Sequence, residues 1–139
     1  MTTDELYRLA ENESVTITTF RLEKRDALSI IDSDGGCYIA IDPSKLTSAA
    51  DEKTKIAHEL GHCVTGAFYN VYSPLDSRQR QENRADKWAI KRLVPRDELK
   101  KAVANGYTEA WQLAELFEVT EGFMRKAISL YEAGNLYSA

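Results

Sequence analysis

The chain has 139 residues, of which 43% are hydrophobic and 29% charged, a composition typical of one globular domain and unlike that of disordered or fibrous proteins. Its formal net charge of −4, with an isoelectric point near 5.3, argues against a main role in coating nucleic acid or an anionic membrane. The chain contains only two histidines, His58 and His62, and they stand four residues apart.

The beginning of the chain predicts a short helix in the first ten residues and then a small sheet. Residues 14–20 alternate with period two and are rich in β-branched side chains, which is typical of a strand. Residues 27–31 and 38–41 are two further short apolar runs, and the glycines between them suit a tight turn. We therefore expect a small antiparallel sheet of about three strands.

The rest of the chain has helical patterns. A helix is predicted over about 48–68, with Ser48 as its N-cap, followed by a loop over 70–80 that contains Pro74. A second helix is predicted over about 81–93, ending before Pro95, and three shorter helices over 96–104, 108–117 and 120–133. The expected architecture is α+β, with residues 1–139 forming a single domain.

The two cysteines and the chain start bear on the compartment. Cys37 and Cys63 are too few for a disulfide framework in a chain of this size. The start of the chain lacks the basic region and apolar run of a signal peptide, and no stretch approaches the roughly 20 apolar residues that span a bilayer. We therefore expect a cytoplasmic protein with both thiols reduced, although one disulfide between them is compatible with the sequence. Cys63 is expected to be a buried packing residue.

The two histidines belong to a His-Glu-Leu-Gly-His motif at 58–62, within the first long helix. Residues four apart on a helix lie one turn apart on the same face, so His58 and His62 can both direct a ring nitrogen at one zinc ion. Glu59 projects to the side, where it can reach a water bound to the metal and act as a general base. The alternative is that two partly buried histidines share this spacing by chance.

The second predicted helix offers a third ligand. Glu82 and Asp86 fall on the same helical stripe as Ala85, Ala89 and Leu93, so the two carboxylates are aligned with the face expected to be buried. A zinc ion would compensate the burial of Glu82, and Asp86 could accept a hydrogen bond from the second ring nitrogen of a ligating histidine. Alternatively, Glu82 lies in solvent at a helix end and Asp86 pairs with a neighbouring cation.

These two helices resemble the ImmA/IrrE family of zinc metallopeptidases, through the motif at 58–62 and the segment Gln-Glu-Asn-Arg-Ala-Asp-Lys-Trp-Ala at 81–89. The resemblance implies a zincin-like fold, one zinc ion held by His58, His62 and Glu82, and Glu59 as the catalytic acid/base. It also implies a protein substrate, because members of the family typically cleave a helix-turn-helix repressor of a phage or mobile element. No residue of the chain identifies that substrate directly.

Two assignments stay open at this point. The loop tyrosines Tyr69 and Tyr72 are the nearest candidates for a group that stabilises the oxyanion, although packing of both rings on the core is the simpler expectation. Residues 108–133 resemble a helix-turn-helix pair, but the start of its second helix is more acidic than a DNA-reading helix requires, so we expect the pair to pack on the rest of the domain. The competing functions are a DNA-binding regulator and a zinc-bound module that binds a partner without cleaving it.

Overall fold

The computed structural model describes residues 1–70 and 72–137. Helix α1 (Thr3–Asn12) precedes three short strands, β1 (Val15–Thr19), β2 (Ala27–Ile31) and β3 (Cys37–Ile41). The strand order is β1-β3-β2, so the last strand of the three lies in the centre of the sheet.

The sheet is mixed, and the expectation of an antiparallel sheet is wrong for β1. Strand β3 pairs antiparallel with β2 but parallel with β1. The turn between β2 and β3 forms as predicted: the Asp32 N–H donates to the Gly36 carbonyl, and Gly35 adopts a φ of +89°. The β1–β2 loop, by contrast, does not form a hairpin. It leads from one edge of the sheet to the other, and β3 then pairs between β1 and β2. Alternating hydrophobicity identifies strands but does not state which strand becomes the neighbour of which.

The helices that follow the sheet differ from their predicted bounds mainly around the loop between the first and the second of them. A 3-10 turn (Pro43–Lys45) leads to α2 (Ala49–Thr65), α3 (Leu75–Leu93), α4 (Arg96–Ala104), α5 (Ala110–Phe117) and α6 (Glu121–Tyr137). Helix α2 ends at Gly66, whose φ of +69° is left-handed. Helix α3 begins directly after Pro74, six residues before the predicted start, because its polar first turns carry no apolar periodicity.

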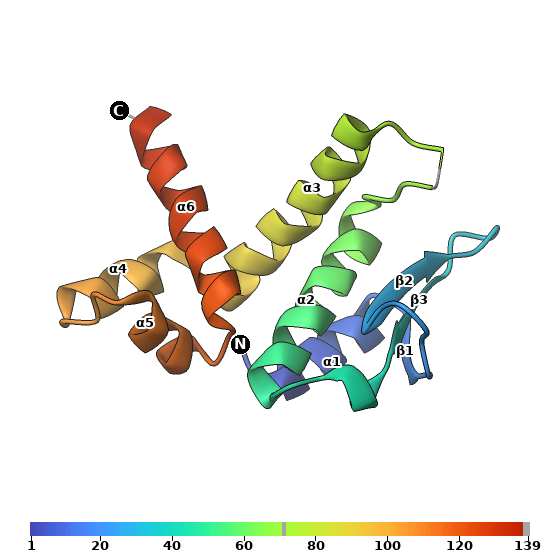
Figure 1. The fold of residues 1–139 in the computed structure, drawn as a ribbon, viewed down its shortest axis with the longest axis horizontal. Helices are drawn as coiled ribbons and strands as arrows, with labels where there is room; N and C mark the ends of the chain where they lie inside the picture. Colours follow the sequence, from blue (N-terminus) through green and yellow to red (C-terminus); the bar gives the residue numbers. More distant parts are fainter. Residues whose placement is uncertain (71, 138–139) are drawn as a thin grey trace.

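Helices α2 and α3 form a hairpin in the middle of the molecule (Figure 1). The sheet and α1 lie on one side of this pair, and α4, α5 and α6 lie on the other. Among the described helices, none has the length and apolar character needed to cross a membrane.

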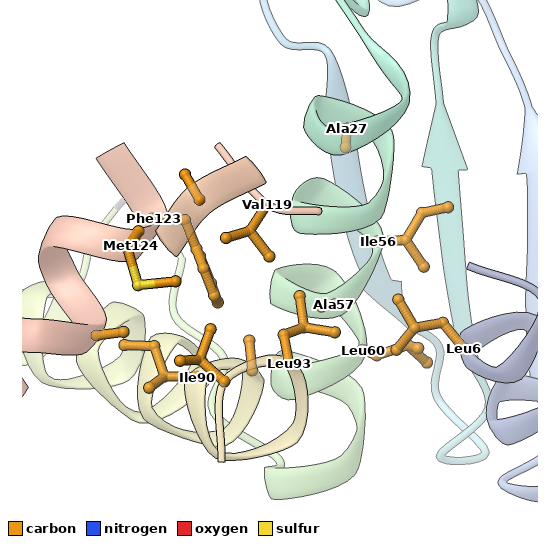
Figure 2. Packing of buried hydrophobic residues seen from close by; sticks show 14 of the residues in the cluster. Leu6, Ala27, Ile56, Ala57, Leu60, Ile90, Leu93, Val119, Phe123 and Met124 are labelled. Carbon is orange, nitrogen blue, oxygen red and sulfur yellow. The ribbon is translucent and has the colours of Figure 1, made fainter. Parts of the chain in front are cut away.

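The hydrophobic core contacts α2 from both of these sides (Figure 2). Ile56 and Leu60 are fully buried next to Leu6 of α1. On the other side, Leu93 of α3 and Phe123 of α6 belong to the same buried cluster. Apolar packing on two sides fixes the position of α2. The polar residues of this helix are therefore held in fixed positions at the boundary between the two halves of the core.

Helices α2 and α3 approach each other closely at Gly61. A Cβ atom placed on Gly61 would lie only 2.6 Å from the carbonyl oxygen of Ala85 and 3.0 Å from its Cα atom. Ala85 and Ala89 are themselves fully buried. Small residues on both helices therefore allow the two backbones to meet between His58 and His62, one turn away from Glu82.

The two cysteines are joined, so the expectation of reduced thiols is wrong for this structure. A disulfide links Cys37 of β3 to Cys63 of α2, with 5.8 Å between their Cα atoms. The sheet packs against α2 and brings together residues that are 26 positions apart, which no local pattern in the sequence reveals. Cys63 packs against the hydrophobic core but is only partly buried, so the expectation of a buried packing residue is confirmed for its packing and wrong for its full burial.

Candidate metal centre

Two helices bring three potential ligands together. His58 and His62 of α2 and Glu82 of α3 each offer one ligand atom, and these atoms all lie within 4.8 Å of one another. The Nε2 atoms of the two histidines are 3.2 Å apart. One carboxylate oxygen of Glu82 is 2.9 Å from Nε2 of His58, and the other is 3.1 Å from Nε2 of His62.

The second ring nitrogen of each histidine is occupied elsewhere. Nδ1 of His58 is 2.7 Å from a carboxylate oxygen of Asp86. Nδ1 of His62 donates to the carbonyl oxygen of Ala67, which can only accept a hydrogen bond. Both contacts leave Nε2 directed at Glu82, as expected for histidines that are oriented for a metal ion.

Asp86 connects this cluster to the C-terminal part of the chain. Its second carboxylate oxygen is 3.3 Å from the ammonium of Lys126 on α6. Asp86 therefore bridges His58 and Lys126, and it does not form the pair with a neighbouring cation of its own helix that the alternative interpretation required.

The electrostatics of the cluster favour positive charge between its carboxylates. Burial opposes the charged form of His58, but hydrogen bonds with Asp86 and Glu82 outweigh this effect and raise the pKa of His58 to about 9. Hydrogen bonds with His58 and His62 hold the pKa of Glu82 far below its usual range. In the metal-free protein, the proton on His58 partly compensates the carboxylates, and a divalent cation would do so more completely.

The donor set fits a catalytic zinc ion. Two imidazole nitrogens and one carboxylate oxygen are a ligand set that zinc uses in hydrolytic enzymes, where a fourth position stays open for water or substrate. The cluster borders a cleft of about 410 Å³ whose walls come from α2, α3 and α6, including Thr54, Phe123 and Lys126. His58 and Glu82 line this cleft, so a ligand could approach their donor atoms from this side, whereas His62 is buried behind them.

Glu59 lies on the face of α2 that is turned to the sheet. It is buried, and its carboxylate accepts a hydrogen bond of 2.9 Å from the hydroxyl of Ser29 on the edge strand β2. Ser29 lies outside the motifs that predict the candidate site. The available signal was a lone hydroxyl residue within the otherwise apolar strand Ala27–Ile31.

The two loop tyrosines have different surroundings. Tyr72 is 92% exposed and packs on nothing that would bury it, whereas Tyr69 is 38% exposed. Partial burial and the negative charge of the Glu82 carboxylate raise the pKa of Tyr69. The simpler expectation, that both rings pack on the core, is therefore wrong for Tyr72.

This small α+β domain brings together two histidines one helical turn apart and a glutamate from a second helix. Such an arrangement is typical of metallopeptidases. A family comparison agrees, since the model of the IrrE N-terminal-like domain, Peptidase_M78, matches residues 10–129, and the chain belongs to this family. Comparison with curated proteins gave no significant match, and comparison with solved structures gave none either.

Proposed function

We propose that this protein is a zinc-dependent endopeptidase in which His58, His62 and Glu82 hold the metal and Glu59 is the general base. The observation that carries the proposal is the convergence of the three donor atoms within 4.8 Å of one another, in a chain of a peptidase family. The hydrogen bonds to Asp86 and Ala67 support it, because they direct both Nε2 atoms at the same point.

The proposed reaction is hydrolysis of a peptide bond. A bound zinc ion would act as a Lewis acid on the scissile carbonyl and lower the pKa of the attacking water. Glu59 accepts a proton from that water as its oxygen forms a bond to the carbonyl carbon. When the carbon–nitrogen bond breaks, Glu59 passes the proton to the leaving amine. Ser29 holds the Glu59 carboxylate in one orientation during these transfers.

The proposed substrate is a helix-turn-helix repressor of a phage or mobile element. Support comes from family membership and from the acidic net charge of −4, which suits a partner that presents a basic DNA-binding surface. We propose that the protein acts on this partner in the cytoplasm.

Direct DNA reading by α6 is the weaker candidate. The two cations near the start of this helix are both engaged, Arg125 with Glu121 at 2.7 Å and Lys126 with Asp86 at 3.3 Å. Phe123 and Met124 of the same turn are buried in the core. The helix therefore has little free basic surface to offer a phosphate backbone.

The test compares zinc-loaded wild type with Glu59→Gln on a proteome-derived peptide library, with cleavage products identified by mass spectrometry. A matched control is Glu115→Gln, since Glu115 is an exposed carboxylate on α5. We expect wild type and Glu115→Gln to cleave the same peptides and Glu59→Gln to retain zinc without cleaving. A metal-loaded Glu59→Gln variant with full activity would exclude Glu59 as the base.

The substrate class needs its own experiment. The helix-turn-helix repressor encoded beside the gene is incubated with wild type and with Glu59→Gln, and its fragments are followed by gel and mass spectrometry. Cleavage by wild type alone supports the repressor as substrate. If the repressor binds stably and stays intact with the zinc-loaded wild type, the protein is a binding module for it.

A further inference from the structure

We propose that the disulfide between Cys37 and Cys63 is a reversible redox switch that positions the general base Glu59. In the oxidised protein, the bond holds the sheet against α2 at the place where Ser29 contacts Glu59. The reduced protein keeps its metal ligands and loses this constraint on the base. The inference rests on the proposed peptidase function and adds a form of control to it.

Two links between the sheet and α2 lie one helical turn apart. Glu59 and Cys63 are four residues apart in α2, so their side chains project from the same face of the helix. Their partners lie on neighbouring strands: Ser29 is opposite Ile39 in the antiparallel register, and Cys37 precedes Ile39 by two positions on the same face of the sheet. The disulfide therefore fixes the separation of sheet and helix close to the hydrogen bond of 2.9 Å from Ser29 to Glu59.

The fold does not depend on this bond. Helix α1, strand β3 and helix α2 contribute fully buried side chains to one hydrophobic core, among them Leu6, Ile39 and Leu60. A chain of 139 residues buries about two-thirds of its unfolded surface and needs no disulfide to fold. In the cytoplasm, where we propose that the protein acts, disulfides are mostly transient and redox-sensing. Reduction should therefore loosen the sheet against α2 without unfolding the domain.

The proposed metal ligands are held by other contacts. They lie on α2 and α3, and these helices pack closely where Gly61 meets Ala85. The ring of His62 is also hydrogen-bonded to the carbonyl oxygen of Ala67. These contacts do not involve the sheet, so the redox state of the cysteines should change the positioning of Glu59 and leave zinc binding unchanged.

The redox step is a thiol–disulfide exchange with a low-molecular-weight thiol such as glutathione. Cys63 is partly exposed and Cys37 is buried, so an incoming thiolate attacks the sulfur of Cys63. A mixed disulfide forms, and the sulfur of Cys37 leaves as a thiolate and takes up a proton. A second glutathione thiolate then attacks the glutathione sulfur of the mixed disulfide, which releases Cys63 as a thiol and glutathione disulfide. The protein disulfide is reduced, two glutathione molecules are oxidised, and the reverse exchange with glutathione disulfide restores the bond.

The first experiment measures cleavage of a peptide after equilibration with glutathione and glutathione disulfide at a series of ratios. Alkylation of free thiols and mass spectrometry give the fraction of protein with the disulfide. We expect kcat to fall by about threefold to tenfold with the same midpoint as this fraction, while zinc affinity stays within about twofold. The double variant Cys37→Ser/Cys63→Ser should have the lower rate at every ratio. Equal kcat in both redox states, or zinc affinity that falls together with kcat, would overturn the proposal.

The variant Ser29→Ala tests the route by which the disulfide acts. If the bond positions Glu59 through Ser29, reduction should change kcat of Ser29→Ala by less than about twofold, because the two changes affect the same contact and are not additive. A fall in kcat of the same factor as in wild type would show that the disulfide does not act through Ser29.

A second readout does not depend on peptidase activity. Hydrogen exchange of the zinc-loaded protein is followed by mass spectrometry in both redox states. We expect exchange over residues 27–41 to be at least about tenfold faster after reduction, and exchange over residues 81–93 of α3 to be unchanged. Equal exchange in both states would overturn the proposal. Faster exchange over residues 27–41 in a protein that cleaves no peptide in either state would refute the proposed function and leave the constraint on the sheet in place.

Discussion

The close contact between α2 and α3 can be tested by adding a single methyl group, in the variant Gly61→Ala. The new Cβ atom would lie 2.6 Å from the carbonyl oxygen of Ala85, and ordinary contact requires the two backbones to separate by about 0.8 Å. In an open helix, alanine would be more stable than glycine by about 0.5–1 kcal/mol. Here the forced separation of two packed helices reverses the sign, and we expect a loss of about 1–3 kcal/mol.

The same separation should reach the metal centre. His58 and His62 flank Gly61 on one helix, and Glu82 lies one turn from Ala85 on the other. A shift of about 0.8 Å is several times the tolerance of roughly 0.2 Å for metal–ligand distances. We therefore expect zinc affinity of Gly61→Ala to fall by at least tenfold, even where the protein stays folded.

The assays are thermal unfolding of the metal-free protein and competition for zinc with a chromophoric chelator. Gly122→Ala on α6 is the matched control, because a Cβ atom at Gly122 would meet no atom within 4 Å. We expect this control to keep wild-type zinc affinity and to unfold at the same or a slightly higher temperature. If Gly61→Ala matches the control in both assays, the helices are free to move apart, and close packing does not set the ligand geometry.

Three further predictions concern the groups around the candidate centre. Asp86→Asn should weaken zinc binding by about 10–100-fold in chelator competition, because the His58 ring loses its charged partner, whereas the exposed Asp97→Asn should have no effect. Ser29→Ala should lower kcat by about tenfold at unchanged zinc affinity, and Ser29→Thr should restore most of it; equal rates for all three would exclude positioning of Glu59. In the metal-free protein, the raised pKa of His58 contributes stability that is complete below pH 6.5, its ordinary pKa, and is lost as the pH rises through about 9. The free energy of unfolding from urea titrations should therefore fall between these two pH values, and a profile that is as steep in His58→Ala would assign the effect to other groups.

Much of the centre was predictable because its signals are local. The spacing of His58 and His62 is one helical turn, and the burial of Ala85, Ala89 and Leu93 confirms the stripe that aligned Glu82 with the core-facing side of α3. Side-chain periodicity is a property of a single helix and needs no knowledge of its neighbours.

The parts that were missed depend on contacts between distant segments. The parallel pairing of β1 with β3 and the disulfide between Cys37 and Cys63 follow from how the strands and α2 pack. Ser29 meets Glu59 for the same reason, across 30 positions of the chain. The early start of α3 was missed because its first turns, apart from the exposed Leu75, are polar and show no apolar stripe.

The contact between Lys126 and Asp86 has a consequence for the charge balance of the loaded protein. Glu59, Glu82 and Asp86 together carry three negative charges, and a divalent cation held by the proposed ligands would compensate two of them. The ammonium of Lys126 supplies one further positive charge, so the centre as a whole would become formally neutral. The last helix thus acts as the counter-ion of a site formed by two earlier helices, and the electrostatic cost of keeping three carboxylates together is shared between the metal and α6.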